Sequence, residues 1–140
     1  MILLDTNVIS ELMRRQPNVV ALAWIASQAR RDIHTTSITK AEIFYGIALL
    51  PEGRRKSSLM SDAQRMFTED LGGRILPFDE AAAAHFAEIA AGRRRAGMPF
   101  DVPDMQIAGI ALALRAAVAT RNVNDFDGCG IEIVNPWASG

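Results

Sequence analysis

Short apolar runs alternate with longer, helix-like stretches along this chain of 140 residues. A short run of aliphatic and β-branched residues that is bounded by polar or turn residues predicts a β-strand. Five such runs occur, at 2–4 (ILL), 33–36 (IHTT), 75–78 (ILPF), 116–120 (AAVAT) and 131–134 (IEIV). Because helix-like segments separate them, the pattern predicts an α/β fold with a central, mostly parallel five-stranded sheet flanked by helices.

Start and stop signals place the helices between these runs. The residues expected near or at helix starts are Pro17, Thr39, Asp79 and Pro103. A further polar, amphipathic helix is expected between the break at 49–58 and the Gly72-Gly73 pair. A chain of this length supports one packed core, so we expect a single domain over residues 1–140.

Composition and charge limit the functions that fit this fold. Fifteen Lys and Arg residues balance sixteen Asp and Glu residues, so the chain has no overall basic field, and a nucleic-acid partner must be met by a local patch. The single cysteine, Cys129, cannot form an internal disulfide. No apolar stretch reaches a bilayer-spanning length, so we expect a cytoplasmic protein with no membrane partner.

Four acidic residues from distant parts of the chain are expected near one edge of the sheet. Asp5 ends the first strand, Glu42 lies in the helix after the second, Asp104 opens the helix before the fourth, and Asp125 follows the fourth. The carboxyl ends of parallel strands meet at a common edge, where ligands gather. Clustered carboxylates repel one another unless protons or a cation intervene, and hard divalent ions such as Mg²⁺ or Mn²⁺ prefer oxygen ligands.

Each acid also has an ordinary structural role open to it. Asp5 can cap a following helix, Asp104 can favour a helix N-terminus, and Asp125 can belong to a turn. Glu42 fits a capping box with Thr39, in which its side chain folds back onto the helix start. If Ser37 is the cap instead, Glu42 lies in the second turn and is free to project.

Four segments carry these acids in a recognisable order, namely ILLDTNVISEL at 2–12, TTSITKAEIFYGI at 35–47, PDMQIAGIALA at 103–113 and VATRNVNDFDGCGIEIVNPW at 118–137. Together they resemble the PIN-domain ribonucleases, and more narrowly the toxins of bacterial toxin–antitoxin pairs of the VapC type, especially the FitB-like branch. The resemblance covers nearly the whole chain. It implies a metal-dependent endoribonuclease that hydrolyses RNA phosphodiester bonds.

The resemblance also assigns roles to individual residues. The acidic quartet expected to be catalytic and to bind Mg²⁺ or Mn²⁺ is Asp5, Glu42, Asp104 and Asp125. The polar residues expected to support these acids are Thr6, Asn7, Thr120 and Asn122. Asp127 has no secure counterpart and is interpreted as a turn residue or an outer helper.

The residues suggest how such a site would act on RNA. No Ser-His or Cys-His pair and no Gly-rich phosphate loop is indicated, so water activated by the ion is the expected nucleophile. Because an acidic pocket repels RNA, cations must hold the RNA backbone. The candidate groups are Arg14-Arg15, Arg30-Arg31, Arg54-Arg55-Lys56 and Arg93-Arg94-Arg95, of which the last is the most suggestive for RNA binding. Arginines of this kind also stabilise helix C-termini, which is the structural alternative.

Partners follow from the resemblance alone. It implies a homodimer and a cognate antitoxin whose C-terminal segment wraps the toxin while its N-terminal domain binds operator DNA. Two other functions stay open. One is a non-catalytic module of the same fold that acts with its antitoxin as a DNA-binding corepressor. The other is a Mg²⁺-dependent phosphohydrolase or phosphoacceptor, which fits less well because "DTN" lacks the second Asp of a D-x-D motif.

Overall fold

The apolar runs form one central sheet in the computed structural model, which describes residues 1–138. Its strands are β1 (Ile2–Leu4), β2 (Ile33–Thr36), β3 (Ile75–Leu76), β4 (Ala117–Ala119) and β5 (Ile133–Val134). All neighbouring strands are parallel, in the order β3-β2-β1-β4-β5. The predicted five-stranded α/β sheet is confirmed, and the strand that leads to Asp5 is the central one.

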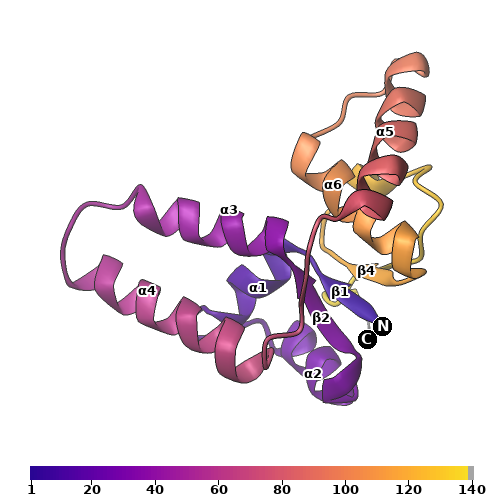
Figure 1. The fold of residues 1–140 in the computed structure, drawn as a ribbon. Coiled ribbons are helices and arrows are strands. Elements are labelled where there is room, and N and C mark those ends of the chain that lie inside the picture. The colour runs from indigo at the N-terminus through magenta and orange to yellow at the C-terminus, as the bar shows by residue number, and fades with distance from the viewer. Residues whose placement is uncertain (139–140) are drawn as a thin grey trace.

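Helices cover both faces of this sheet (Figure 1). They are α1 (Thr6–Leu12), α2 (Val19–Ser27), α3 (Ser37–Ala48), α4 (Arg54–Arg65), α5 (Glu80–Arg95) and α6 (Val102–Leu114). The shorter segments are the 3₁₀ turns η1 (Arg30–Asp32) and η3 (Val123–Phe126) and the π-helical turn η2 (Met66–Asp70), which continues α4. Within residues 1–138, no helix is long and apolar enough to cross a membrane.

The helix starts test the predicted caps. Asp79 caps α5 as predicted, because its side chain accepts a hydrogen bond from the Ala82 N–H at 3.0 Å. The predicted start at Thr39 is wrong. Helix α3 begins at Ser37, since Thr36 is the cap and its hydroxyl accepts a hydrogen bond from the Thr39 N–H at 3.1 Å. The extended backbone at the end of β2 places Thr36 where an N-cap residue is needed.

Alternation along the central strand separates two cores. Leu3 packs with α5 and α6, whereas the next residue, Leu4, packs with α1, α3 and α4 on the opposite face. Figure 1 shows the consequence, with α3 and α4 forming an arm on one side and α5 and α6 a separate lobe on the other.

Close packing of α5 against α6 positions the lobe. A Cβ atom at Gly109 in α6 would lie 2.6 Å from the Ala82 carbonyl oxygen of α5, so the two backbones approach as only glycine permits. This contact holds the middle of α6, the helix that carries Asp104 in its first turn, against the first turns of α5.

Candidate active site

Asp5 occupies the junction between β1 and α1 and is the N-cap of α1. Its Oδ1 accepts a hydrogen bond from the Thr6 N–H at 2.8 Å, and its Oδ2 accepts one from the Thr120 hydroxyl at 2.8 Å. The side chain is only 4% exposed, and burial raises the pKa of Asp5 despite the lowering effect of these hydrogen bonds. The capping role and the place in the acidic site therefore coexist, because each role uses a different oxygen.

A small polar network holds the second oxygen of Asp5. Asn7 donates from Nδ2 to the Thr120 hydroxyl at 3.1 Å and to Asp5 Oδ2 at 3.3 Å, and its Oδ1 accepts a hydrogen bond from the Arg121 N–H. The Asn122 backbone N–H donates to the same hydroxyl, at 3.1 Å. Thr120 is fully buried. The predicted neighbours Asn7, Thr120 and Asn122 thus surround Asp5, Asn122 through its backbone.

Glu42 projects from the second turn of α3 toward α1. Its Oε1 accepts a hydrogen bond from the Thr6 hydroxyl at 2.7 Å, so Thr6 joins the first acid-bearing segment to the second. The capping-box interpretation of Glu42 is wrong because Thr36, not Thr39, caps this helix. Ser37 is not the cap either. Glu42 nevertheless projects from the second turn, as was expected for a helix that starts before Thr39, and it faces the site.

Asp104 and Asp125 complete the cluster from the other side. Asp104 lies in the first turn of α6, and burial, followed by the charge of Asp5, raises its pKa to about 7. Smaller contributions come from Asp101, Asp125 and Glu42. Asp125 lies in η3 and also raises the pKa of Asp5. The four predicted acids therefore share one electrostatic neighbourhood beside the end of β1.

The donor chemistry of this cluster suits a hard divalent cation. All four groups are carboxylates, and Mg²⁺ is usually held by one or two carboxylates together with waters and substrate phosphates. Among residues 1–138, no three His, Cys, Asp or Glu side chains lie close enough to form a preassembled metal cage. The four carboxylates thus share a neighbourhood without forming a closed set of metal ligands among the described residues.

The three consecutive arginines at the end of α5 have different surroundings. Arg93 is only 6% exposed and donates to backbone carbonyls, so the prediction that it contacts RNA is wrong. The reason is helical geometry, because consecutive residues on a helix point in directions about 100° apart. Arg94 and Arg95 are exposed, and their contact with RNA stays a prediction.

An open cavity of about 950 Å³ lies between α1, α3 and α4, and Thr6 and Glu42 form part of its wall. Its floor includes Ile43, Ile47 and Leu59, and its other lining residues include Arg14, Arg15 and Arg55. Arg14 also lies 3.4 Å from the buried carboxylate of Glu11.

Arg121 is a basic residue at the site that sequence reasoning did not single out. Its guanidinium lies over the Trp137 ring, with 5.3 Å between them, and it lines a smaller cavity of about 410 Å³ together with Asp125. Its place between Thr120 and Asn122 was the available signal, since these neighbours were already expected beside the acids.

Comparison with known proteins adds independent findings. The sequence model described as the PIN domain matches residues 2–128. The chain is 38% identical to the VapC ribonuclease Y4jK of Sinorhizobium fredii, over 98% of each chain. It is 40% identical to the toxin FitB of Neisseria gonorrhoeae, over 98% of this chain and 99% of FitB.

A solved structure has the same fold. The structure of FitAB bound to an IR36 DNA fragment includes a chain that superposes with a TM-score of 0.89 at 40% identity. The match covers 98% of this chain and 96% of the other.

Proposed function

Because this chain belongs to the PIN-domain family, we propose that it is a metal-dependent endoribonuclease toxin of a toxin–antitoxin pair. The observation that carries the proposal is the convergence of Asp5, Glu42, Asp104 and Asp125 in one electrostatic neighbourhood. Similarity to a VapC ribonuclease and to the toxin FitB supports the same reaction class.

The residues divide the work of phosphodiester hydrolysis between them. Asp5, Asp104 and Asp125 would hold Mg²⁺ or Mn²⁺, directly or through water. The ion, when bound, would lower the pKa of a water molecule and neutralise charge on the leaving oxygen. Glu42, which the Thr6 hydroxyl orients, would bind the ion or position the attacking water. The Thr120 hydroxyl keeps Asp5 in place during the reaction.

A non-catalytic corepressor is not favoured as an alternative. Such a module would not require four carboxylates near one another, an arrangement that costs free energy through mutual repulsion. Burial is the main cause of the raised pKa of Asp104, but the charges of Asp5, Asp125 and Glu42 add to it, and this part is a sign of that cost.

We propose that the antitoxin occupies the cavity between α1, α3 and α4. An apolar floor with an arginine rim suits an amphipathic segment that carries acidic side chains. The cavity reaches Glu42, so a bound segment would also obstruct the site. Operator DNA would then be bound through the antitoxin, in keeping with the FitAB structure, which contains DNA.

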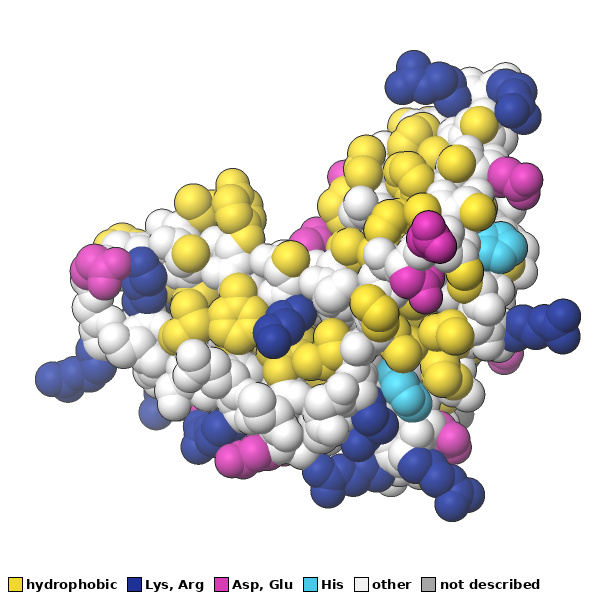
Figure 2. Space-filling model, in the orientation of Figure 1, with side chains coloured by type: hydrophobic (Ala, Val, Ile, Leu, Met, Phe, Trp, Pro, Cys, Tyr) yellow, Lys and Arg dark blue, Asp and Glu magenta, His cyan; other side chains and the backbone are white. Residues whose placement is uncertain are grey.

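We propose a homodimer through the hollow between the α3–α4 arm and the α5–α6 lobe. Figure 2 shows hydrophobic side chains on both sides of this hollow. Large exposed apolar residues of these elements include Tyr45 and Leu49 on the arm and Val102 on the lobe. Analytical ultracentrifugation should give twice the chain mass, and Tyr45→Glu with Leu49→Glu should give a monomer.

The proposed activity is tested by RNA cleavage with purified protein. Wild-type protein and Asp125→Asn are incubated with total RNA in chelator or in Mn²⁺, and new 5′ ends are sequenced. We expect discrete cleavage sites with wild type in Mn²⁺ only, and none with Asp125→Asn. Asp125 is exposed, so its replacement should leave the fold intact. Cleavage in chelator, or cleavage by the variant at the wild-type rate, would overturn the proposal.

A further inference from the structure

Arg93 is a buried cation held entirely by uncharged groups. Its Nη2 donates to the carbonyl oxygens of Asp125 at 2.8 Å and Asp127 at 2.6 Å, and its Nη1 donates to that of Pro99 at 3.2 Å. In the part of the chain that the structure describes, no carboxylate forms an ion pair with it. A buried charge without a counter-ion is costly, so this arrangement calls for an explanation beyond packing.

The carbonyls that Arg93 contacts belong to two separate acid-bearing segments. Pro99 lies in the connection from α5 to α6 and precedes Asp104 by five residues. The other two carbonyls belong to Asp125 itself and to Asp127, at the end of η3. One guanidinium therefore links the backbone that leads to Asp104 with the backbone that carries Asp125.

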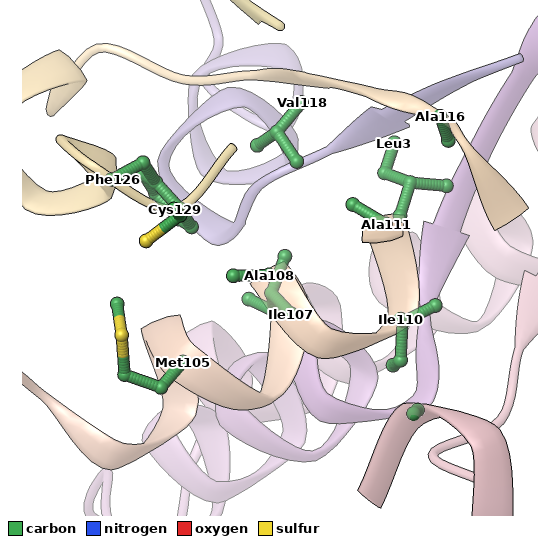
Figure 3. Close-up of a cluster of buried hydrophobic side chains, with 11 residues drawn as sticks. Leu3, Met105, Ile107, Ala108, Ile110, Ala111, Ala116, Val118, Phe126 and Cys129 are labelled. Atoms are coloured by element: carbon green, nitrogen blue, oxygen red, sulfur yellow. The ribbon is translucent and has the colours of Figure 1, made fainter. Parts of the chain in front are cut away.

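The surrounding packing makes this link rigid. Phe126 and Cys129, on either side of the Asp127 carbonyl, belong to the same buried cluster as Met105, the residue after Asp104. Figure 3 shows Phe126 and Cys129 lying together and facing the Met105 side chain. The two segments thus meet through side chains in the core and through Arg93 at the edge of that core.

The geometry of the guanidinium group is what allows Arg93 to link the two backbone segments. Arginine presents several N–H groups in a flat, rigid fork, so one side chain can donate to two segments at once in a fixed relative orientation. A lysine ammonium on a flexible stem preserves the charge but not the fork. The Arg93 side chain is thus suited to setting a distance between backbones, a task that charge alone does not accomplish.

We propose that Arg93 is a positioning residue that sets the relative placement of Asp104 and Asp125 for metal binding. This inference rests on the proposed ribonuclease function. Arg93 acts through backbone carbonyls and does not contact substrate, because it is buried. Its role therefore differs from that of the exposed neighbours Arg94 and Arg95.

The test compares Arg93→Lys and Arg93→Met with wild type and with Phe67→Leu. Phe67 is buried in the core on the other face of the sheet, so its replacement lowers stability without touching the acid-bearing segments. For Arg93→Lys we expect Mn²⁺ affinity, measured by calorimetry, to fall about tenfold, the range for groups that support metal ligands. The kcat for RNA cleavage should fall by a similar factor with KM changed less than about twofold. Arg93→Met should lose more Mn²⁺ affinity and more of the kcat than Arg93→Lys. Phe67→Leu should keep the wild-type values of both.

Hydrogen exchange provides a readout that does not depend on metal or RNA. Amides of 97–101 and 123–129 should exchange faster in Arg93→Lys than in Phe67→Leu at matched melting temperature. Wild-type Mn²⁺ affinity and kcat in Arg93→Lys, or the same exchange in both variants, would reduce Arg93 to a stabilising residue and overturn the inference. If wild type itself neither binds Mn²⁺ nor cleaves RNA, the proposed function fails, and exchange alone then decides whether Arg93 holds the two segments together.

Discussion

Asp5 and Asp104 carry the same carboxylate at the same site, but their surroundings differ. Asp5 is buried and accepts hydrogen bonds from the Thr6 N–H, the Thr120 hydroxyl and the Asn7 amide. Asp104 is half-buried, accepts no side-chain hydrogen bond from the residues that the structure describes, and has its pKa raised to about 7. Hydrogen bonds offset part of the free-energy cost of burying the Asp5 charge, whereas no described side chain donates one to Asp104. The hydrogen bonds of Asp5 therefore belong to the fold, whereas no described side chain offsets the cost of burying the Asp104 charge.

The largest expected effect on RNA cleavage is that of replacing Asp5, the acid that accepts the most hydrogen bonds. Asp5→Asn should lower RNA cleavage by on the order of 10²-fold or more, since losing a ligand costs more than losing a group that supports one. It should also lower the free energy of unfolding by about 1 to 2 kcal/mol, because an amide cannot accept the hydrogen bonds on both of its sides. Single-turnover cleavage and urea unfolding in chelator measure the two effects. Wild-type stability in Asp5→Asn would show that the hydrogen bonds of Asp5 do not stabilise the fold.

Glu42 is intermediate between Asp5 and Asp104 in its hydrogen bonding, because it accepts one hydrogen bond, from the Thr6 hydroxyl. Glu42→Gln should lower cleavage by roughly tenfold, because an amide oxygen is a weaker ligand for a hard ion. Its stability should match wild type within about 0.5 kcal/mol, since the amide oxygen can still accept from Thr6 and Thr36 caps the helix. Cleavage rates and unfolding midpoints check both parts. Full activity would show that holding Thr6 is the only role of Glu42.

Asp104 should respond to substitution in the opposite direction from Asp5. Asp104→Asn removes an uncompensated charge while keeping its shape, so in chelator it should be more stable than wild type by on the order of 1 kcal/mol. Millimolar Mn²⁺ should reverse the order, because only wild type gains RT ln(1 + [L]/Kd) from the ion. Melting curves in both conditions provide the test. If the variant is destabilised in chelator and both proteins respond equally to Mn²⁺, Asp104 is only a helix-start residue.

The same difference predicts a pH dependence of stability without metal. The folded-state pKa of Asp104 is about 7, and that of an unfolded Asp is about 4, so between these values the folded chain holds a proton that the unfolded chain has lost. The free energy of unfolding should therefore decrease as pH rises from 5 to 8, by up to about 1 kcal/mol after allowance for partial exposure. Urea unfolding in chelator, with the Asp104→Asn profile subtracted, isolates this group. A flat difference would mean that Asp104 titrates near its ordinary pKa.

The smallest effect is expected outside the acidic cluster. Replacing Arg94 and Arg95 together with Gln should weaken RNA binding severalfold and reduce the slope of log K against log salt by about one or two. Mn²⁺ affinity should not change, because these side chains are exposed and make no contact with the acids. Filter binding at several salt concentrations measures the slope. An unchanged slope would assign both residues to the solvent-exposed end of α5.

The strands and the acids could be predicted because their signals are local. Each strand is a short apolar run between polar residues, and the acids follow strand ends or start helices in the same segments. The order of the segments in the sequence then suffices to bring the acids to one edge, since parallel strands align their carboxyl ends. Helix starts were less secure, as Thr36 and Thr39 both offer a hydroxyl and only the backbone at the end of β2 selects Thr36.

The tertiary structure alone decided what each polar group faces. The sequence does not distinguish the three arginines at 93–95. The helical turn of about 100° per residue directs only Arg93 toward the backbone carbonyls of Pro99 and of the segment that carries Asp125. Likewise, the resemblance placed Thr120 among the residues that support the acids but did not say which acid it contacts. Only the structure shows that Thr120 donates to Asp5, more than a hundred residues away, and that Asp104 accepts no hydrogen bond from a side chain within residues 1–138. Such partners come from distant parts of the chain, so burial and hydrogen bonding, and with them the charge of a carboxylate, are set only when those parts meet.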